Sequence, residues 1–346
     1  MDYTLALLNF VHLVATYGLV GGIMFIRFVS TPVMRGLEPT TPVAGTLLFE
    51  GTNRLIKFVW FYIALSIITG IPMMLMNRDF QGLGSTNNTW STAILAKHAL
   101  IIAMLIAIMV QTLTVRSIQR LRKESQPRDA EGKPSASDML KRLGSRMDRL
   151  ALSYAILGIL VLGLTSVTAT QKFHYSTLIN FAHILLTVAW IGGLMFLVFV
   201  GVPIISKNLK TMGVLDAVEH MLAVGKKFII ILWTALIFAI ATGIPLMLSN
   251  SQYRGLLKID DLWSGAMFAK HVAFVGMILG AISITRTIVT TNKLCKAAHL
   301  AKPSEEMLAE IDKRRRTIVA MGKLGFAVAS IVLLCTAIVS SMMKAQ

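Results

Sequence analysis

The chain of 346 residues is 55% hydrophobic and only 15% charged, and its mean hydropathy is +0.69. This balance excludes a soluble globular domain and is typical of a polytopic membrane protein. A formal net charge of +17 would indicate nucleic acid as the partner of a soluble protein. Here the basic residues lie mostly between apolar stretches, so the expected partner is the lipid bilayer and no nucleic acid.

Eight apolar stretches of about 20 residues are long enough to cross the hydrocarbon core of a bilayer. We therefore expect an all-α polytopic membrane protein with eight transmembrane helices. They are predicted near residues 5–28, 56–76, 92–115, 150–170, 178–201, 228–248, 265–288 and 320–342.

The segments richest in Lys and Arg all fall on one side of the membrane if the spans alternate. The positive-inside rule makes that side cytoplasmic. The sequence thus predicts a multi-pass protein of the cytoplasmic (inner) membrane with both termini extracytoplasmic. Trp90 and Trp263 precede the third and seventh spans, where an outer aromatic belt is expected, so we interpret them as interfacial anchors.

The chain contains an internal repeat, because its two halves align over their whole length with an offset of 170 to 173 residues. The motif Thr-Gly-Ile-Pro at 69–72 recurs at 242–245, and Ala-Lys-His at 96–98 recurs at 269–271. Pro32 likewise matches Pro203. Four spans per copy is an even number, so both copies have the same, parallel orientation.

Two tandem four-helix repeats are therefore predicted. The first spans 1–170, with a cytoplasmic loop at about 117–148, and the second spans 171–346, with a loop at about 289–318. The first loop is charged and rich in Pro, Gly and Ser, and we expect it to join helical extensions of its two spans. In the second loop, Ser304 is placed to cap the start of a helix.

Four of the seven histidines lie inside predicted spans: His12, His98, His183 and His271. An ionisable group at membrane depth is costly and is a candidate for a functional site. His12 and His98 lie on the first and third spans of their repeat, each roughly 10 Å below the outer side. His183 and His271 repeat this arrangement.

Two imidazoles at equal depth on two helices of a bundle are suited to ligate one haem iron from both faces. Each repeat is therefore a candidate site for one haem b, giving up to two in the chain. Neutral imidazole also suits copper, and the spacing does not separate the two metals. A third interpretation is that each histidine only hydrogen-bonds a neighbouring helix.

Lys97 and Lys270 directly precede the third-span histidines. An ammonium group at this depth either snorkels to the membrane surface or pairs with an anion such as a phosphate or a porphyrin propionate. Met73, Met74 and Met76 lie at the outer end of the second span, where thioethers would suit Cu(I) or simply pack. The chain has no P-loop, dinucleotide fingerprint or Ser–His–Asp arrangement, so a hydrolase or an ATP-driven pump is not expected.

The second repeat resembles the membrane domain of copper resistance protein D (CopD), a four-span unit associated with copper uptake or homeostasis. It is also similar to HemJ-type protoporphyrinogen oxidases, four-span proteins associated with haem b. The resemblance rests on His183, Trp190-Ile191-Gly192-Gly193, Pro203, Lys227-Phe228, Thr242-Gly243, Trp263 and Lys270, in this order. It implies His183 and Lys270 as a functional pair, with His12 and Lys97 as their copies. The first repeat departs from the pattern at Leu19, where the family tryptophan would stand.

The leading hypothesis is a b-type haem protein that exchanges electrons with a quinol or a partner subunit, and if it is an enzyme it is an oxidoreductase. The alternative is a CopD-like copper transport or homeostasis protein with a redox or copper partner on the outer side. A second alternative is a structural subunit of a larger membrane complex, which would hold neither cofactor.

Overall fold

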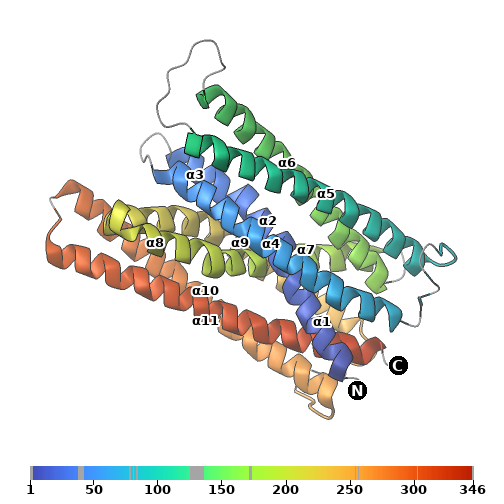
Figure 1. Ribbon diagram of the computed structural model, residues 1–346. Helices are drawn as coiled ribbons and strands as arrows, with labels where there is room; N and C mark the ends of the chain where they lie inside the picture. The colour runs from blue at the N-terminus through green and yellow to red at the C-terminus, as the bar shows by residue number, and fades with distance from the viewer. Residues whose placement is uncertain are drawn as a thin grey trace. The chain divides into compact units, whose positions relative to one another are not determined.

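The computed structural model describes residues 3–37, 43–77, 79–80, 82, 85–124, 136–170, 174–253, 255, 257–301 and 303–344. These residues form long helices joined by short turns, and no strand occurs in the parts described (Figure 1). Eight helical segments among them are long and apolar enough to cross a membrane. The prediction of an all-α polytopic membrane protein in contact with lipid is confirmed.

The elements are α-helices, and three π turns widen the first and fifth spans. In chain order they are α1 (Tyr3–Thr16), η1 (Tyr17–Gly21), α2 (Gly22–Phe25), η2 (Ile26–Ser30), α3 (Thr31–Leu37), α4 (Val43–Leu75), α5 (Thr89–Glu124), α6 (Ala136–Thr170), α7 (Tyr175–Phe196), η3 (Leu197–Gly201), α8 (Val202–Met212), α9 (Val214–Leu248), α10 (Leu262–Leu300) and α11 (Glu305–Lys344).

The chain forms two compact units, which we describe separately. Unit 1 comprises Met1–Phe80 and Leu178–Gln346, and unit 2 comprises Gln81–Thr177. In unit 2, α5 and α6 pack against each other. The Ser166 hydroxyl near the end of α6 donates to the Thr177 carbonyl in the first turn of α7 at 2.7 Å. The two sequence repeats, 1–170 and 171–346, do not coincide with these units, and their formation as separate four-helix domains stays a prediction.

Unit 1 is built around the first and fifth spans. In the most apolar window of Tyr3–Gly36, 67% of residues are buried, and the value for Tyr175–Met212 is 56%, against 17 to 39% in the other six spans. Within unit 1, α1 packs on α4 and α11, while α9, α10 and α11 pack on one another. Helix α1 begins and helix α11 ends at the same end of this unit (Figure 1).

The π turns η2 and η3 occupy matching positions, since residues 26–30 become 197–201 with an offset of 171. Each turn lies just before a proline, Pro32 or Pro203. A proline lacks an N–H group and its ring clashes with the carbonyl four residues earlier, here that of Phe28 or Phe199. Both carbonyls belong to the widened turns, which relieves the clash without ending the span.

The first and fifth spans cross at Gly21 and Gly192. A methyl group added at Gly21 would lie 2.1 Å from the Val188 carbonyl oxygen, and one added at Gly192 would lie 2.2 Å from the Tyr17 carbonyl oxygen. Only glycine allows backbones to approach this closely. The same offset of 171 relates Gly21 to Gly192 and Tyr17 to Val188, so the two spans present equivalent surfaces to each other.

One end of unit 1 carries many basic residues, among them Lys207, Lys226 and Arg314, and we call it the base-rich end. There α10 continues to Leu300 and α11 begins at Glu305. The Met307 backbone N–H donates to the Ser304 hydroxyl at 3.2 Å, which confirms the predicted N-cap. In unit 2, α5 and α6 also extend into the predicted loop at about 117–148, and residues 125–135 lie outside the described part.

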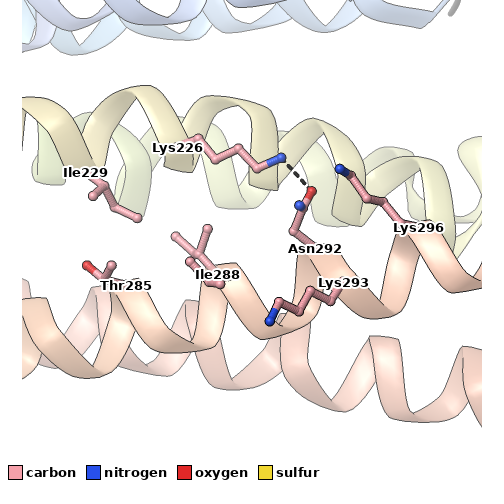
Figure 2. A pocket seen from close by; sticks show the side chains of 8 residues that line it. Lys226, Ile229, Thr285, Ile288, Asn292, Lys293 and Lys296 are labelled. Atoms are coloured by element: carbon pink, nitrogen blue, oxygen red, sulfur yellow. Dashed lines mark hydrogen bonds between the residues drawn. The ribbon is translucent and has the colours of Figure 1, made fainter.

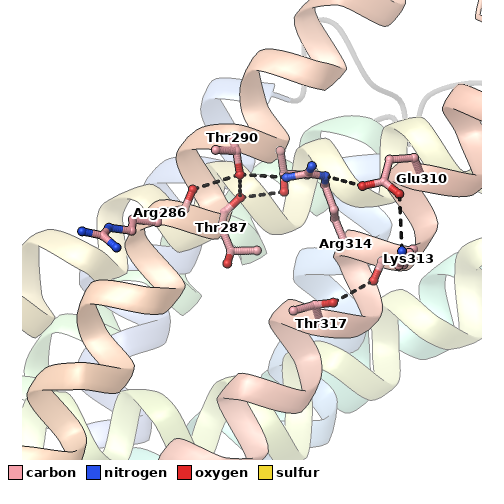
Figure 3. Close-up of polar contacts among 8 residues, drawn as sticks. Arg286, Thr287, Thr290, Glu310, Lys313, Arg314 and Thr317 are labelled. Carbon is pink, nitrogen blue, oxygen red and sulfur yellow. Dashed lines mark hydrogen bonds and ion pairs between the residues drawn. The ribbon is translucent and has the colours of Figure 1, made fainter.

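A polar cluster joins α10 to α11 at the base-rich end (Figure 3). The Arg314 guanidinium donates through Nη1 to the Thr290 hydroxyl and through Nε to the Glu310 carboxylate, each at 2.9 Å. The Thr290 hydroxyl in turn donates to the Arg286 carbonyl at 3.0 Å. The cluster fixes the register of the two helices where they leave the apolar region.

Replacing Arg314 with alanine should lower the free energy of unfolding by about 0.5–1 kcal/mol, because partly exposed ion pairs and single hydrogen bonds contribute about this much. The measurement is the thermal midpoint in detergent at low and high salt, and the difference should shrink at high salt. Lys313→Ala is the control: its ammonium lies 4.0 Å from Glu310 and its side chain is 77% exposed, so no change is expected. Equal effects of both variants would contradict a specific role for Arg314.

Trp263 is buried in the protein. It is 3% exposed and packs with Ala266 and Val339, and Trp90 is 7% exposed. An interfacial anchor presents its ring to the lipid headgroups, so the interpretation of these two side chains as anchors is wrong. Amphipathic rings at the membrane boundary suit helix packing equally well, and sequence position alone does not separate the two roles.

Candidate functional site

His183 on α7 is half-buried and hydrogen-bonds the neighbouring helix α9. Its Nδ1 atom lies 2.9 Å from the Thr242 hydroxyl oxygen. The Thr242 hydroxyl donates its own proton to the Phe238 carbonyl at 2.5 Å, so it accepts from Nδ1. The neutral imidazole therefore carries its proton on Nδ1 and its lone pair on Nε2.

Gly243 on α9 lies beside the His183 ring. A methyl group added there would lie 3.4 Å from His183 Cε1, which is ordinary contact. The Thr-Gly pair thus supplies a hydrogen-bond acceptor and a close neighbour for the ring, which gives a physical reason for the Thr-Gly part of the motif at 242–245.

His12 on α1 makes the same contacts with the first copy of the motif. Its Nδ1 atom lies 3.0 Å from the Thr69 hydroxyl oxygen, and Thr69 donates to the Leu65 carbonyl at 2.6 Å. A methyl group added at Gly70 would lie 3.2 Å from His12 Cε1. His12 and His183 therefore adopt the same tautomer through equivalent partners.

The Lys270 ammonium on α10 interacts electrostatically with two groups of unit 1, the His183 ring on α7 and the Cys335 thiol on α11. His183 and Lys270 are the pair that the family resemblance implies, and their roles stay a prediction.

A hydrogen-bond chain links the His183 turn to the first span. The Thr187 hydroxyl donates to the His183 carbonyl at 2.7 Å. The buried Tyr17 hydroxyl lies 3.3 Å from the Thr187 hydroxyl and donates to it, since the Thr187 proton is already engaged. Tyr17 thereby holds the α7 backbone at the histidine in register with the glycine crossing.

His271 and His98 bond to their own helices. His271 Nδ1 lies 2.7 Å from the Met267 carbonyl on α10, and His98 Nδ1 lies 2.7 Å from the Ile94 carbonyl on α5. A carbonyl only accepts, so both rings carry the proton on Nδ1, as His12 and His183 do. His271 is half-buried and His98 is exposed.

The predicted histidine pairs stay predictions. His183 and His271 both belong to unit 1, and the hydrogen bonds described above join each to a different partner. His12 belongs to unit 1, whereas His98 and the half-buried Lys97 belong to unit 2. Within the described parts of the chain, no group of three or more His, Cys, Asp or Glu side chains is arranged to hold a metal ion.

The three methionines of the copper hypothesis lie at the end of α4. Met73 and Met74 are half-buried in its last turn, and Met76 directly follows the helix and is 45% exposed. Met73 and Met74 are adjacent in the helix, so their side chains point about 100° apart. Their copper role is untested by this geometry.

The sequence reasoning missed Thr69 and Thr242 as partners of the histidines and Cys335 as a neighbour of Lys270. The threonines left a signal, because the same Thr-Gly pair occurs in both copies at the depth of the histidine. Cys335 left none, since Leu164 stands at the matching position of the first repeat.

No protein-family model matches this chain, and no curated protein or solved structure is detectably similar to it.

Proposed function

We propose that the protein is a membrane-embedded b-type haem protein that exchanges electrons with a quinol or a partner subunit. The observation that carries the proposal is the contact that Nδ1 of His12, His98, His183 and His271 makes with an oxygen of the protein. Each ring donates from Nδ1 to an oxygen of the protein, which leaves the lone pair on Nε2. This is the state in which a histidine ligates iron.

The partner of Nδ1 supports this assignment for His183. A metal-ligating histidine almost always donates its second ring N–H to a fixed acceptor, which orients the ring and raises its basicity. Thr242 supplies that acceptor from a neighbouring helix at 2.9 Å.

Lys270 supports an anionic ligand in the same region. Its ammonium lies within electrostatic reach of His183, at a depth where a charge needs a partner. A haem carries two propionate carboxylates, and Lys270 would pair with one of them. When bound, haem supplies one-electron transfer, while the residues of this chain orient the imidazole, balance the charge and exclude water.

A porphyrin provides four ligands to its iron, so the protein needs to supply only one imidazole on each face. We propose His183 and His271, which both belong to unit 1, as these ligands. For the first repeat, His12 and His98 stay the ligands that the sequence predicts, and the number of haems, one or two, reports how many pairs assemble.

The test is the visible absorption spectrum of the purified protein with metal analysis of the same sample. Haem binding predicts a Soret band, a pyridine haemochrome of the b type and iron at one or two equivalents per chain. A protein expressed with sufficient haem that shows neither band nor iron would refute the proposal.

Copper is the second candidate, because neutral imidazole with its lone pair on Nε2 suits copper as well as iron. Met73, Met74 and Met76 at the end of α4 would deliver Cu(I) from the outer side. Bound copper without a Soret band would select this function. If the protein binds neither haem nor copper, a structural subunit of a larger complex is the remaining candidate.

A further inference from the structure

A pocket of about 410 Å³ lies between α9 and α10 at the base-rich end of unit 1 (Figure 2). It lies on the same two helices as Thr242 and His271, but none of the residues of the proposed haem site lines it. Its walls divide into a cationic half and an apolar half. The cationic half lies nearer the helix ends and the apolar half lies deeper along the helices, and this order indicates the kind of ligand.

The cationic half consists of Lys226 from α9 with Lys293 and Lys296 from α10. Lys226 reaches across to α10, where its ammonium donates to the Asn292 side-chain oxygen at 2.5 Å, and Lys296 reaches toward α9 (Figure 2). All three lysines are exposed, and none makes an ion pair with a residue that the structure describes.

Glu219, seven residues before Lys226 on α9, contacts His299 Nε2 on α10 at 2.6 Å and does not line the pocket. Three positive charges thus line one opening without a carboxylate among its lining residues. Such an opening attracts an anion.

The apolar half lies deeper in the membrane. Helix α9 enters the membrane from the base-rich end, so Ile229 is about one turn below Lys226. Helix α10 runs the opposite way, so Ile288 and Val289 are about one turn below Asn292. The Val289 side chain is 49% exposed and offers an open apolar wall.

We propose that this pocket binds an anionic phospholipid of the leaflet at the base-rich end. The lysine ammoniums donate charge-assisted hydrogen bonds to the lipid phosphate, and an acyl chain lies against Ile229, Ile288 and Val289. Basic pockets between transmembrane helices are suited to anionic headgroups. A free phosphate ion would use the lysines only and would gain nothing from the apolar wall, so we commit to the lipid.

The experiment is native mass spectrometry of the delipidated full-length protein titrated with phosphatidylglycerol or phosphatidylcholine. Wild type should retain one phosphatidylglycerol in clear preference to phosphatidylcholine. The triple variant Lys226→Gln, Lys293→Gln, Lys296→Gln should bind it at least about 10-fold more weakly, since each basic side chain contributes about fivefold. The control triple variant Lys57→Gln, Lys210→Gln, Lys313→Gln removes the same charge from exposed bases outside the pocket and should bind as wild type.

Three outcomes would overturn the proposal. They are equal loss in the pocket and control variants, equal binding of phosphatidylcholine, and displacement of the lipid by millimolar inorganic phosphate. The variant Lys293→Glu, Lys296→Glu keeps the contact between Lys226 and Asn292 and guards against misfolding as the cause. It should elute as wild type on size exclusion and still lose the lipid.

Discussion

Replacing Gly192 with leucine should destabilise the protein strongly, by about 3 kcal/mol or more. Even one methyl group at this position would lie 2.2 Å from the Tyr17 carbonyl oxygen and 2.5 Å from the Gly21 Cα atom. Both are backbone atoms of the opposite span, so no rotamer change relieves the clash and the two spans must separate. We expect the thermal midpoint in detergent to fall by roughly 5–10 °C.

Gly280→Leu is the matched control. Gly280 is also inside a long transmembrane helix, α10, but it is exposed and a methyl group there meets no atom within 4 Å. Its replacement should leave the midpoint nearly unchanged. Gly21→Leu should reproduce the effect of Gly192→Leu, because the two positions are equivalent across the crossing. A midpoint near that of wild type for either crossing variant would contradict the close contact.

Replacing His183 with alanine should remove the haem of the second repeat, because the proposed site then lacks the imidazole that α9 orients. If wild type holds two haems, the iron content per chain should fall by half, and if it holds one, haem should be lost. The measurement is the pyridine haemochrome per mole of protein. Wild-type haem content in this variant would rule out His183 as a ligand.

Replacing Thr242 with valine tests the same site while keeping the proposed ligand His183. Valine keeps the shape of threonine but removes the acceptor of the Nδ1 hydrogen bond, and the loss of such a partner weakens metal affinity about 10–100-fold. Thr165→Val is its control, since the Thr165 hydroxyl bonds only the Val161 carbonyl of its own helix at 2.8 Å. His174→Ala controls for removal of an imidazole, because His174 lies exposed outside the spans.

Much of the helical architecture was predictable because it follows from local composition. Eight apolar stretches became eight helices long enough to cross a membrane, and Ser304 capped the helix that it was expected to cap. The helices extend well beyond the predicted spans at the base-rich end, since polar residues there continue the same backbone hydrogen bonding. Hydropathy predicts which part of a helix contacts lipid, but it does not predict the residue at which the helix ends.

The candidate site was only partly predictable because side-chain partners depend on which helices touch. His183 was predicted as a site residue because an ionisable side chain inside a membrane is energetically costly. Its hydrogen bond to Thr242 depends on the packing of α7 on α9, which the sequence does not show. The resemblance pointed to Lys270, and the structure brings this lysine near His183. Cys335 has no counterpart in the first repeat and no motif around it, so only packing reveals it.

The glycine crossing has a consequence for how a duplicated chain assembles. Equivalent surfaces of the first and fifth spans meet there, so a single four-span copy carries everything needed to form this contact with a second copy of itself. The tandem chain is in this respect a homodimer made covalent, with its stoichiometry fixed at one to one. The two halves still differ close to the crossing, where the buried Trp190 stands in one copy and the buried Leu19 in the other.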